Sequence, residues 1–89
     1  MKLPLTIFKE GKQFVAYTPA LDIATAGKTE KDARRMFREL VSVFMEEIIT
    51  TGTAEEVLTE LGWKKEQEKW NPPQLASSDF IDINIPAFA

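Results

Sequence analysis

The 89-residue sequence contains no cysteine and no histidine. It therefore cannot form a disulfide, a Cys–His nucleophile pair, a Ser-His-Asp triad or a zinc site of the Cys/His type. It also lacks a long apolar run: no stretch approaches the roughly 20 apolar residues of a membrane span. Pro4, Thr6, Lys9 and Glu10 interrupt the N-terminal stretch where a signal peptide would have its apolar core. We therefore expect a cytoplasmic protein with no membrane partner.

The excess of one charge sign is small. Eleven Lys and Arg residues stand against fourteen Asp and Glu residues, a net charge of −3, which argues against a protein that holds nucleic acid through its whole-surface field. With 44% apolar residues the chain is globular. A single domain over residues 1–89 buries only roughly 60–65% of its unfolded surface, so self-association or a partner would add stability.

The first 27 residues predict a β-meander. Leu3, Leu5 and Ile7 alternate with polar residues or proline, and "QFVAYT" at residues 13–18 has strand character. The polar turn between them contains Gly11, which permits a positive φ, so the two strands should form a hairpin. After the Pro19 bend, "DIATAG" reads as a third strand, and Gly27 at its end should free the backbone to turn into a helix.

Two helices should follow the meander. Residues 29–51 carry apolar side chains at three- and four-residue spacing, and Thr29 stands three residues before Asp32 as an N-cap. Residues 53–61 form a shorter amphipathic segment with a capping box of Thr53 and Glu56.

The C-terminal quarter divides into a connector and a strand. Residues 64–79 are polar and broken by proline, and Trp63 and Trp70 should pin this connector to the body. Residues 80–86 alternate again, with isoleucine at positions 81, 83 and 85. A right-handed crossover would place this strand parallel to the first one, in the order 3-2-1-4. The pattern does not decide whether it pairs within its own chain or is exchanged with a neighbouring chain.

The predicted fold is therefore α+β: a three-stranded antiparallel meander plus a C-terminal strand, one long helix on one face, and a short second helix. The second strand is apolar on both sides, with Phe14 and Ala16 on one and Val15 and Tyr17 on the other. Either one face of the sheet stays open as an interaction surface, or the short helix and the Trp-containing connector cover it. The candidate partner-binding residues are Val15, Tyr17, Leu21 and Asp22.

The stretch "FVAYTPALDIATAGKTEKDA" followed by "RRMFRELVSVFMEE" resembles the HicB-like antitoxin family. The shared features are the aromatic-apolar strand, the P-x-L at residues 19–21, Gly27 with Thr29, and a helix that has acidic residues in its first turn and contains Ala33. The resemblance covers about residues 3–47, with a final strand expected at 81–85, and it implies a partial RNase H-like fold.

The resemblance implies a non-catalytic, protein-binding role without cofactor or metal. HicB proteins neutralise HicA toxins, which are small RNA-cleaving proteins, and they often self-associate. The expected partners are thus the chain itself, as a dimer or tetramer, and a HicA-like toxin. Many members carry a C-terminal DNA-binding domain, whereas the last ten residues here predict a strand. Together with the extra short helix and "WNPP", this indicates a stand-alone short variant.

Two alternatives remain. A vestigial nuclease would need carboxylates converging on metal ions about 4 Å apart, and the candidates Asp22, Asp79 and Asp82 lie on separated segments.

The second alternative is an RNA- or DNA-binding module, which would use the basic flank of the first helix. That flank consists of Lys31, Arg34, Arg35 and Arg38. Interleaved acids allow i,i+4 ion pairs there, so a solvated helix face is favoured and direct nucleic-acid binding is not expected.

Overall fold

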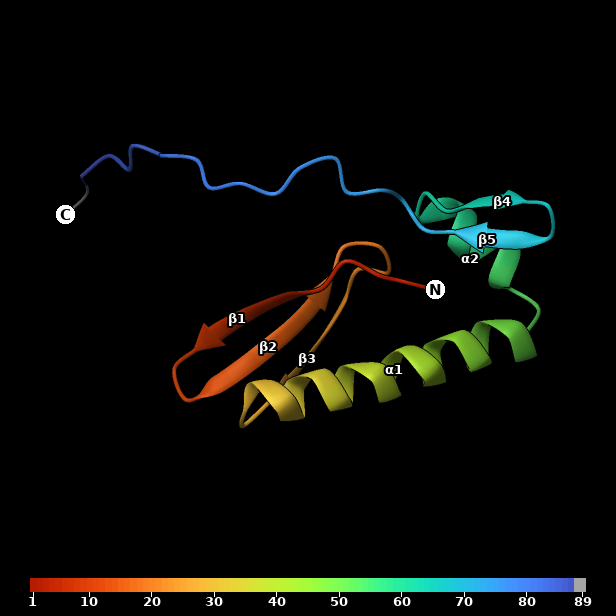
Figure 1. Cartoon of the computed structure of the whole chain (residues 1–89), viewed down its shortest axis with the longest axis horizontal. Helices are drawn as coiled ribbons and strands as arrows, with labels where there is room; N and C mark the ends of the chain where they lie inside the picture. Colours follow the sequence, from red (N-terminus) through yellow and green to blue (C-terminus); the bar gives the residue numbers. More distant parts are fainter. Residues whose placement is uncertain (88–89) are drawn as a thin grey trace.

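The computed structural model describes residues 1–87 of the chain. It contains a three-stranded sheet, two helices and a separate two-stranded hairpin (Figure 1). In chain order the elements are β1 (Thr6–Glu10), β2 (Gln13–Thr18), β3 (Ile23–Gly27), α1 (Glu30–Thr50), α2 (Ala54–Glu60), β4 (Lys64–Glu66) and β5 (Lys69–Asn71). The predicted α+β class, the antiparallel meander, the long helix and the short helix are confirmed.

The sheet has the order β1-β2-β3, and both strand pairs are antiparallel. The turn between β1 and β2 contains Gly11 at φ +59°, a left-handed conformation that glycine adopts without steric cost. The strand predicted to include Leu3 begins instead at Thr6, because Thr6 pairs with Tyr17 and β2 continues only one residue further, to Thr18.

Helix α1 begins as its sequence predicts and packs against β2 and β3. The Thr29 hydroxyl accepts a hydrogen bond from the Asp32 amide at 3.0 Å. The buried Ala33 and Phe37 of α1 form one core cluster with Ala16 of β2. This packing brings α1 very close to the end of β3.

Gly27 is required at that point for a different reason from the one expected. Its φ is not among the left-handed values, and it is paired with Phe14 in the strand ladder. A Cβ atom at this position would lie 2.6 Å from the Ala33 nitrogen and 2.9 Å from the Asp32 carbonyl carbon. Glycine therefore allows the close approach of the helix rather than a turn of the chain.

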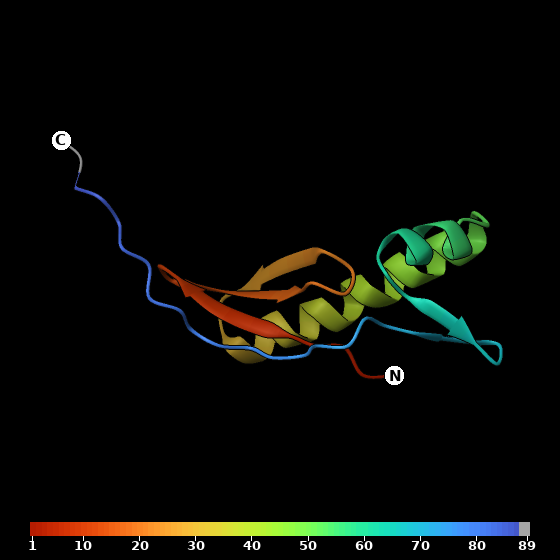
Figure 2. The same cartoon turned by 90° about the horizontal axis from the view of Figure 1, so that it is seen from above.

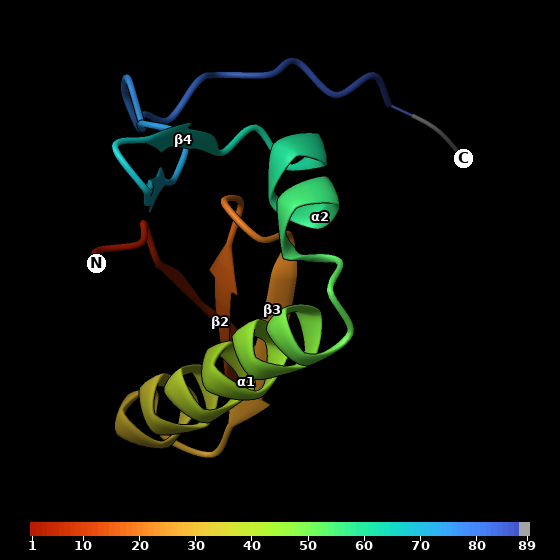
Figure 3. The ribbon, with the colours of Figure 1, turned by 90° about the vertical axis from the view of Figure 1, so that its right-hand side faces the viewer.

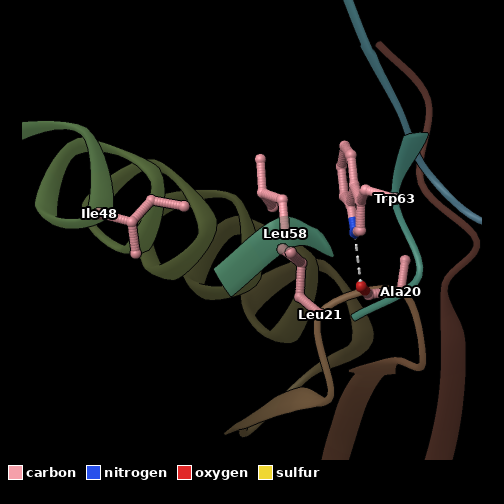
Figure 4. Close-up of a cluster of buried hydrophobic side chains, with 5 residues drawn as sticks. All are labelled: Ala20, Leu21, Ile48, Leu58 and Trp63. Carbon is pink, nitrogen blue, oxygen red and sulfur yellow. Dashed lines mark hydrogen bonds between the residues drawn. The ribbon is translucent and has the colours of Figure 1, made fainter. Parts of the chain in front are cut away.

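A second core cluster joins the far half of α1 to α2 and to the loop between β2 and β3. Its buried members are Ala20, Leu21, Ile48, Leu58 and Trp63 (Figure 4). The Trp63 indole Nε1 donates a hydrogen bond to the Ala20 carbonyl at 2.8 Å. The expectation that Trp63 and Trp70 pin the connector is confirmed, since Trp70 also packs against this cluster. The predicted capping box of α2 is wrong: Thr53 makes no side-chain cap, and its Oγ1 lies 2.9 Å from the Thr51 Oγ1.

The segment assigned as a connector, residues 64–79, contains the antiparallel hairpin β4–β5. Its turn places Gln67 at φ +50° and Glu68 at φ +66°. Glycine, asparagine and aspartate usually occupy such positions, so the Gln-Glu pair gave no turn signal in the sequence.

The predicted C-terminal strand at residues 80–86 is absent from the single chain, and the order 3-2-1-4 is wrong for it. No β-pairing involves residues 72–87, which we call the C-terminal tail. The tail leaves β5 through Pro72 and Pro73 and runs past the β1 side of the sheet without joining it (Figures 1 and 2). Phe80 is 105% exposed. A strand needs an edge whose N–H and C=O groups it can pair with, and residues 72–87 form no such pairing within this chain.

Candidate functional site

The face of the sheet turned away from α1 is apolar and uncovered. Residues directly opposite one another in the ladder share a face, so the contact of Ala16 with α1 fixes the orientation of the whole sheet. The other side, which we call the open face, carries Thr6, Phe8, Val15, Tyr17, Ala24 and Ala26, and Glu10 and Gln13 form its polar end beside the β1–β2 turn. Phe8 is 50% exposed, Ala24 is exposed, and Val15 and Tyr17 are half-buried.

The short helix and the connector do not cover this face. Figure 3 shows α2 and β4 beyond the end of the sheet, above the C-terminal half of α1. Their anchor, Trp63, packs on Ala20 and Leu21 in the β2–β3 loop. Val15 and Tyr17 belong to neither buried cluster. Of the two readings that the sequence left open, the structure favours the uncovered face.

The prediction that Leu21 binds a partner is wrong, because Leu21 is a core residue. Its side chain is 3% exposed and packs with Trp63, Leu58 and Ile48. A partner could not reach it without separating α2 from the sheet. Phe8 takes its place on the surface, because it lies opposite Val15 in the register. The sequence signal for Phe8 was available: it occupies the face opposite Ile7, which packs against the core with Ala16.

Tyr17 and Asp22 are brought together across the β2–β3 loop. The Tyr17 hydroxyl donates to the Asp22 Oδ1 at 3.0 Å, and Asp22 adopts φ +53°, which aspartate tolerates better than most residues. The hydrogen bond to Asp22, with partial desolvation and the negative charge of the carboxylate, raises the pKa of Tyr17 above its usual value of 10.0. The bond fixes the ring on the open face, with its polar end satisfied.

The basic flank of α1 is engaged in ion pairs on the helix itself. Arg34 lies 3.2 Å from Glu30, and Arg35 lies 3.2 Å from Glu39 and 3.8 Å from Asp32. The predicted i,i+4 pairs are therefore confirmed. Lys31 and Arg38 are exposed, and neither forms an ion pair within residues 1–87. Two of the four cations are thus already partnered by acids.

The acidic residues do not converge. Within the described part of the chain, no three Asp or Glu side chains gather in a way that could hold a metal ion. Asp22 is bonded to Tyr17, whereas Asp79 and Asp82 lie on the tail, exposed. The arrangement offers no two-metal geometry for phosphodiester cleavage.

A surface cleft of about 850 Å³ lies where the tail leaves the body. It is lined by residues 2–4 on one side, by Gly62, Lys64 and Glu66 on another, and by residues 71–75. No buried side-chain nitrogen or oxygen within residues 1–87 lacks a hydrogen-bond partner, so the cleft has no orphaned polar group aimed at a ligand. Its lining shows that the start of the tail lies beside the residues that precede β1.

None of the helices in the described range is long and apolar enough to cross a membrane. Comparisons of the chain with models of protein families, with curated proteins and with solved structures found no match.

Proposed function

We propose that this chain is a non-catalytic protein-interaction domain of the HicB-like antitoxin kind, which binds and neutralises a small RNA-cleaving toxin through the open face. The observation that supports this most strongly is the apolar, uncovered side of the sheet around Phe8, Val15 and Tyr17. Exposed contiguous apolar surface on a small domain commonly marks an interaction site.

The chemistry of the open face suits a protein partner. Phe8 and Tyr17 supply aromatic area, which dominates the energetics of protein interfaces. Tyr17 is already oriented by its bond to Asp22, so less side-chain freedom is lost on binding. The net charge of −3 would also favour encounter with a basic partner, as a protein that cleaves RNA is expected to be.

Co-expression with a small basic protein encoded beside this chain's gene tests the proposal. The expected result is rescue of growth and of RNA integrity, with a complex measurable by calorimetry. Phe8→Asp should weaken that complex by about tenfold or more, because it places a charge in an apolar contact. Ser42→Asp adds the same charge to an exposed position on α1 and should bind as the unmodified chain does.

Unchanged affinity of the Phe8→Asp variant would contradict the open face as the binding surface. Salt-dependent binding of generic RNA that disappears on replacing Lys31 and Arg38 would instead support the nucleic-acid alternative.

A further inference from the structure

The tail exposes a strand-forming sequence with nothing against it. Ile81 is 74% exposed, Ile83 68% and Ile85 73%, and all three lie on one side of an alternating segment. Isoleucine is among the residues most often buried and most favoured in strands. Residues 80–86 therefore have the composition of a paired strand and the exposure of an unpaired one.

The molecule as a whole is too extended for its mass. Its accessible surface is 7491 Å², whereas a folded monomer of 10.1 kDa is expected to expose about 5300 Å². Its radius of gyration is 16.1 Å, against about 12 Å for a compact chain of this length. The surface in excess, about 2200 Å², is as large as a specific protein interface buries in total.

The outer edge of β1 could accept such a strand. Because the order is β1-β2-β3, one edge of β1 has no neighbouring strand among the described residues. The opposite edge strand, β3, is packed against α1, whereas β1 makes few contacts with that helix. The tail also starts on the β1 side, near the N-terminal segment (Figure 2). There residues 2–4 and residues 72–75 line the same cleft. An unpaired edge strand is a template for another chain.

The tail of the same chain reaches that edge out of register. Since residues 72–75 lie beside residues 2–4, an extended tail running along β1 would set residues 76–80, Ala-Ser-Ser-Asp-Phe, against Thr6–Glu10 and leave the isoleucines without a partner. Ile83 and Ile85 would then project beyond the β1–β2 turn. The same length of chain is suited to spanning the gap to a second molecule.

We infer that residues 80–86 add as a strand to the free edge of β1 in a second copy of this chain, reciprocally, so that two copies form a two-fold dimer. The exchange pairs the backbone of the tail and covers its isoleucine row. This goes beyond the proposed function, because it requires no toxin and would hold if the open face bound none.

Light scattering during size-exclusion chromatography of the full chain tests the dimer. The expected mass is twice 10.1 kDa. Ile83→Asp should weaken self-association by about tenfold or more, because it places a charge in the covered row. Asn84→Asp puts the same charge on the other side of the same segment and serves as the matched control. A monomeric parent chain, or equal loss in both variants, would overturn the inference.

Exchange is distinguished from pairing within one chain by a mixed sample. The chain has no cysteine, so Lys12→Cys in the β1–β2 turn carries a single spin label. Spin-labelled chains without isotope enrichment are mixed with isotope-enriched parent chains that carry no spin label. The amide signals of residues 81–85 in the parent chains should then broaden. Broadening only when the spin and the isotope share one chain would show pairing within the chain and overturn the exchange. If this broadening is observed but the parent chain binds no toxin, the result would count against the proposed function and not against the exchange.

Discussion

Strand β2 and residues 80–86 both have strand-forming sequences, yet only β2 is a strand in the single chain. β2 lies between β1 and β3, and its Ala16 and Thr18 are completely buried. The tail segment has a cleaner alternation of isoleucine with polar residues, and its isoleucines remain largely exposed. Alternation therefore defines which side of a strand is apolar, but a free edge that can be reached in register decides whether the strand forms.

The same contrast separates the folded body, residues 1–71, which has buried core clusters, from the tail, which has none. The body is closed at one end by Trp63, whose ring is buried and whose Nε1 reaches Ala20, 43 positions earlier in the chain.

Trp63→Ala should lower the free energy of unfolding by about 3–5 kcal/mol, because it leaves a large cavity between α2 and the β2–β3 loop. Denaturant unfolding followed by circular dichroism measures the change. Trp63→Phe keeps most of the packing and loses the hydrogen bond to Ala20, so its cost should be nearer 1 kcal/mol. A small effect of Trp63→Ala would mean that the cluster does not hold the body together.

Gly27→Ala should destabilise the body by about 1–3 kcal/mol, because the new methyl group would press on the backbone of α1 at Ala33. Gly11→Ala is a useful comparison. It meets no neighbouring atom, and its cost comes from the positive φ alone. If thermal unfolding showed Gly27→Ala to be neutral, the close approach of α1 to β3 would be wrong.

The smallest effect concerns Tyr17, which is the only tyrosine in the chain, so phenolate absorbance titrates it alone. Its pKa is raised in the folded state by Asp22. The folded form thus holds the proton more tightly than the unfolded form, and this stabilisation is complete below about pH 10 and lost as the pH rises through the raised pKa. Asp22→Asn should lower the pKa of Tyr17 towards its usual value, whereas Asp79→Asn, on the tail, should leave it unchanged. Identical titrations of all three chains would contradict the contact.

The elements fixed by local sequence could be predicted. Gly11 at the first turn, Thr29 at the start of α1 and the apolar stripe of that helix each act within a few residues. What could not be predicted depends on distant contacts: the burial of Leu21 needs Trp63 to arrive from far along the chain.

The candidate surface was predicted in part for the same reason. Val15 and Tyr17 follow from the two-sided pattern of β2. The alternation around Ile7 places Phe8 on the other face of β1, and the register of β1 with β2 then sets Phe8 opposite Val15. The β4–β5 hairpin was missed because its turn uses Gln67 and Glu68 in left-handed conformations. Under the inferred exchange, the fate of residues 80–86 depends on a second molecule, which a single sequence does not contain.

Amide hydrogen exchange of residues 81–85 at two protein concentrations tests the central claim most directly. If these residues form a strand on β1 of a second copy, their protection should rise with concentration, because the population of dimer rises. Exchange at the unprotected rate at both concentrations, with β1, β2 and β3 protected, would contradict the account. With the lower concentration set where light scattering finds the monomer mass, protection independent of concentration would show instead that the tail pairs within its own chain.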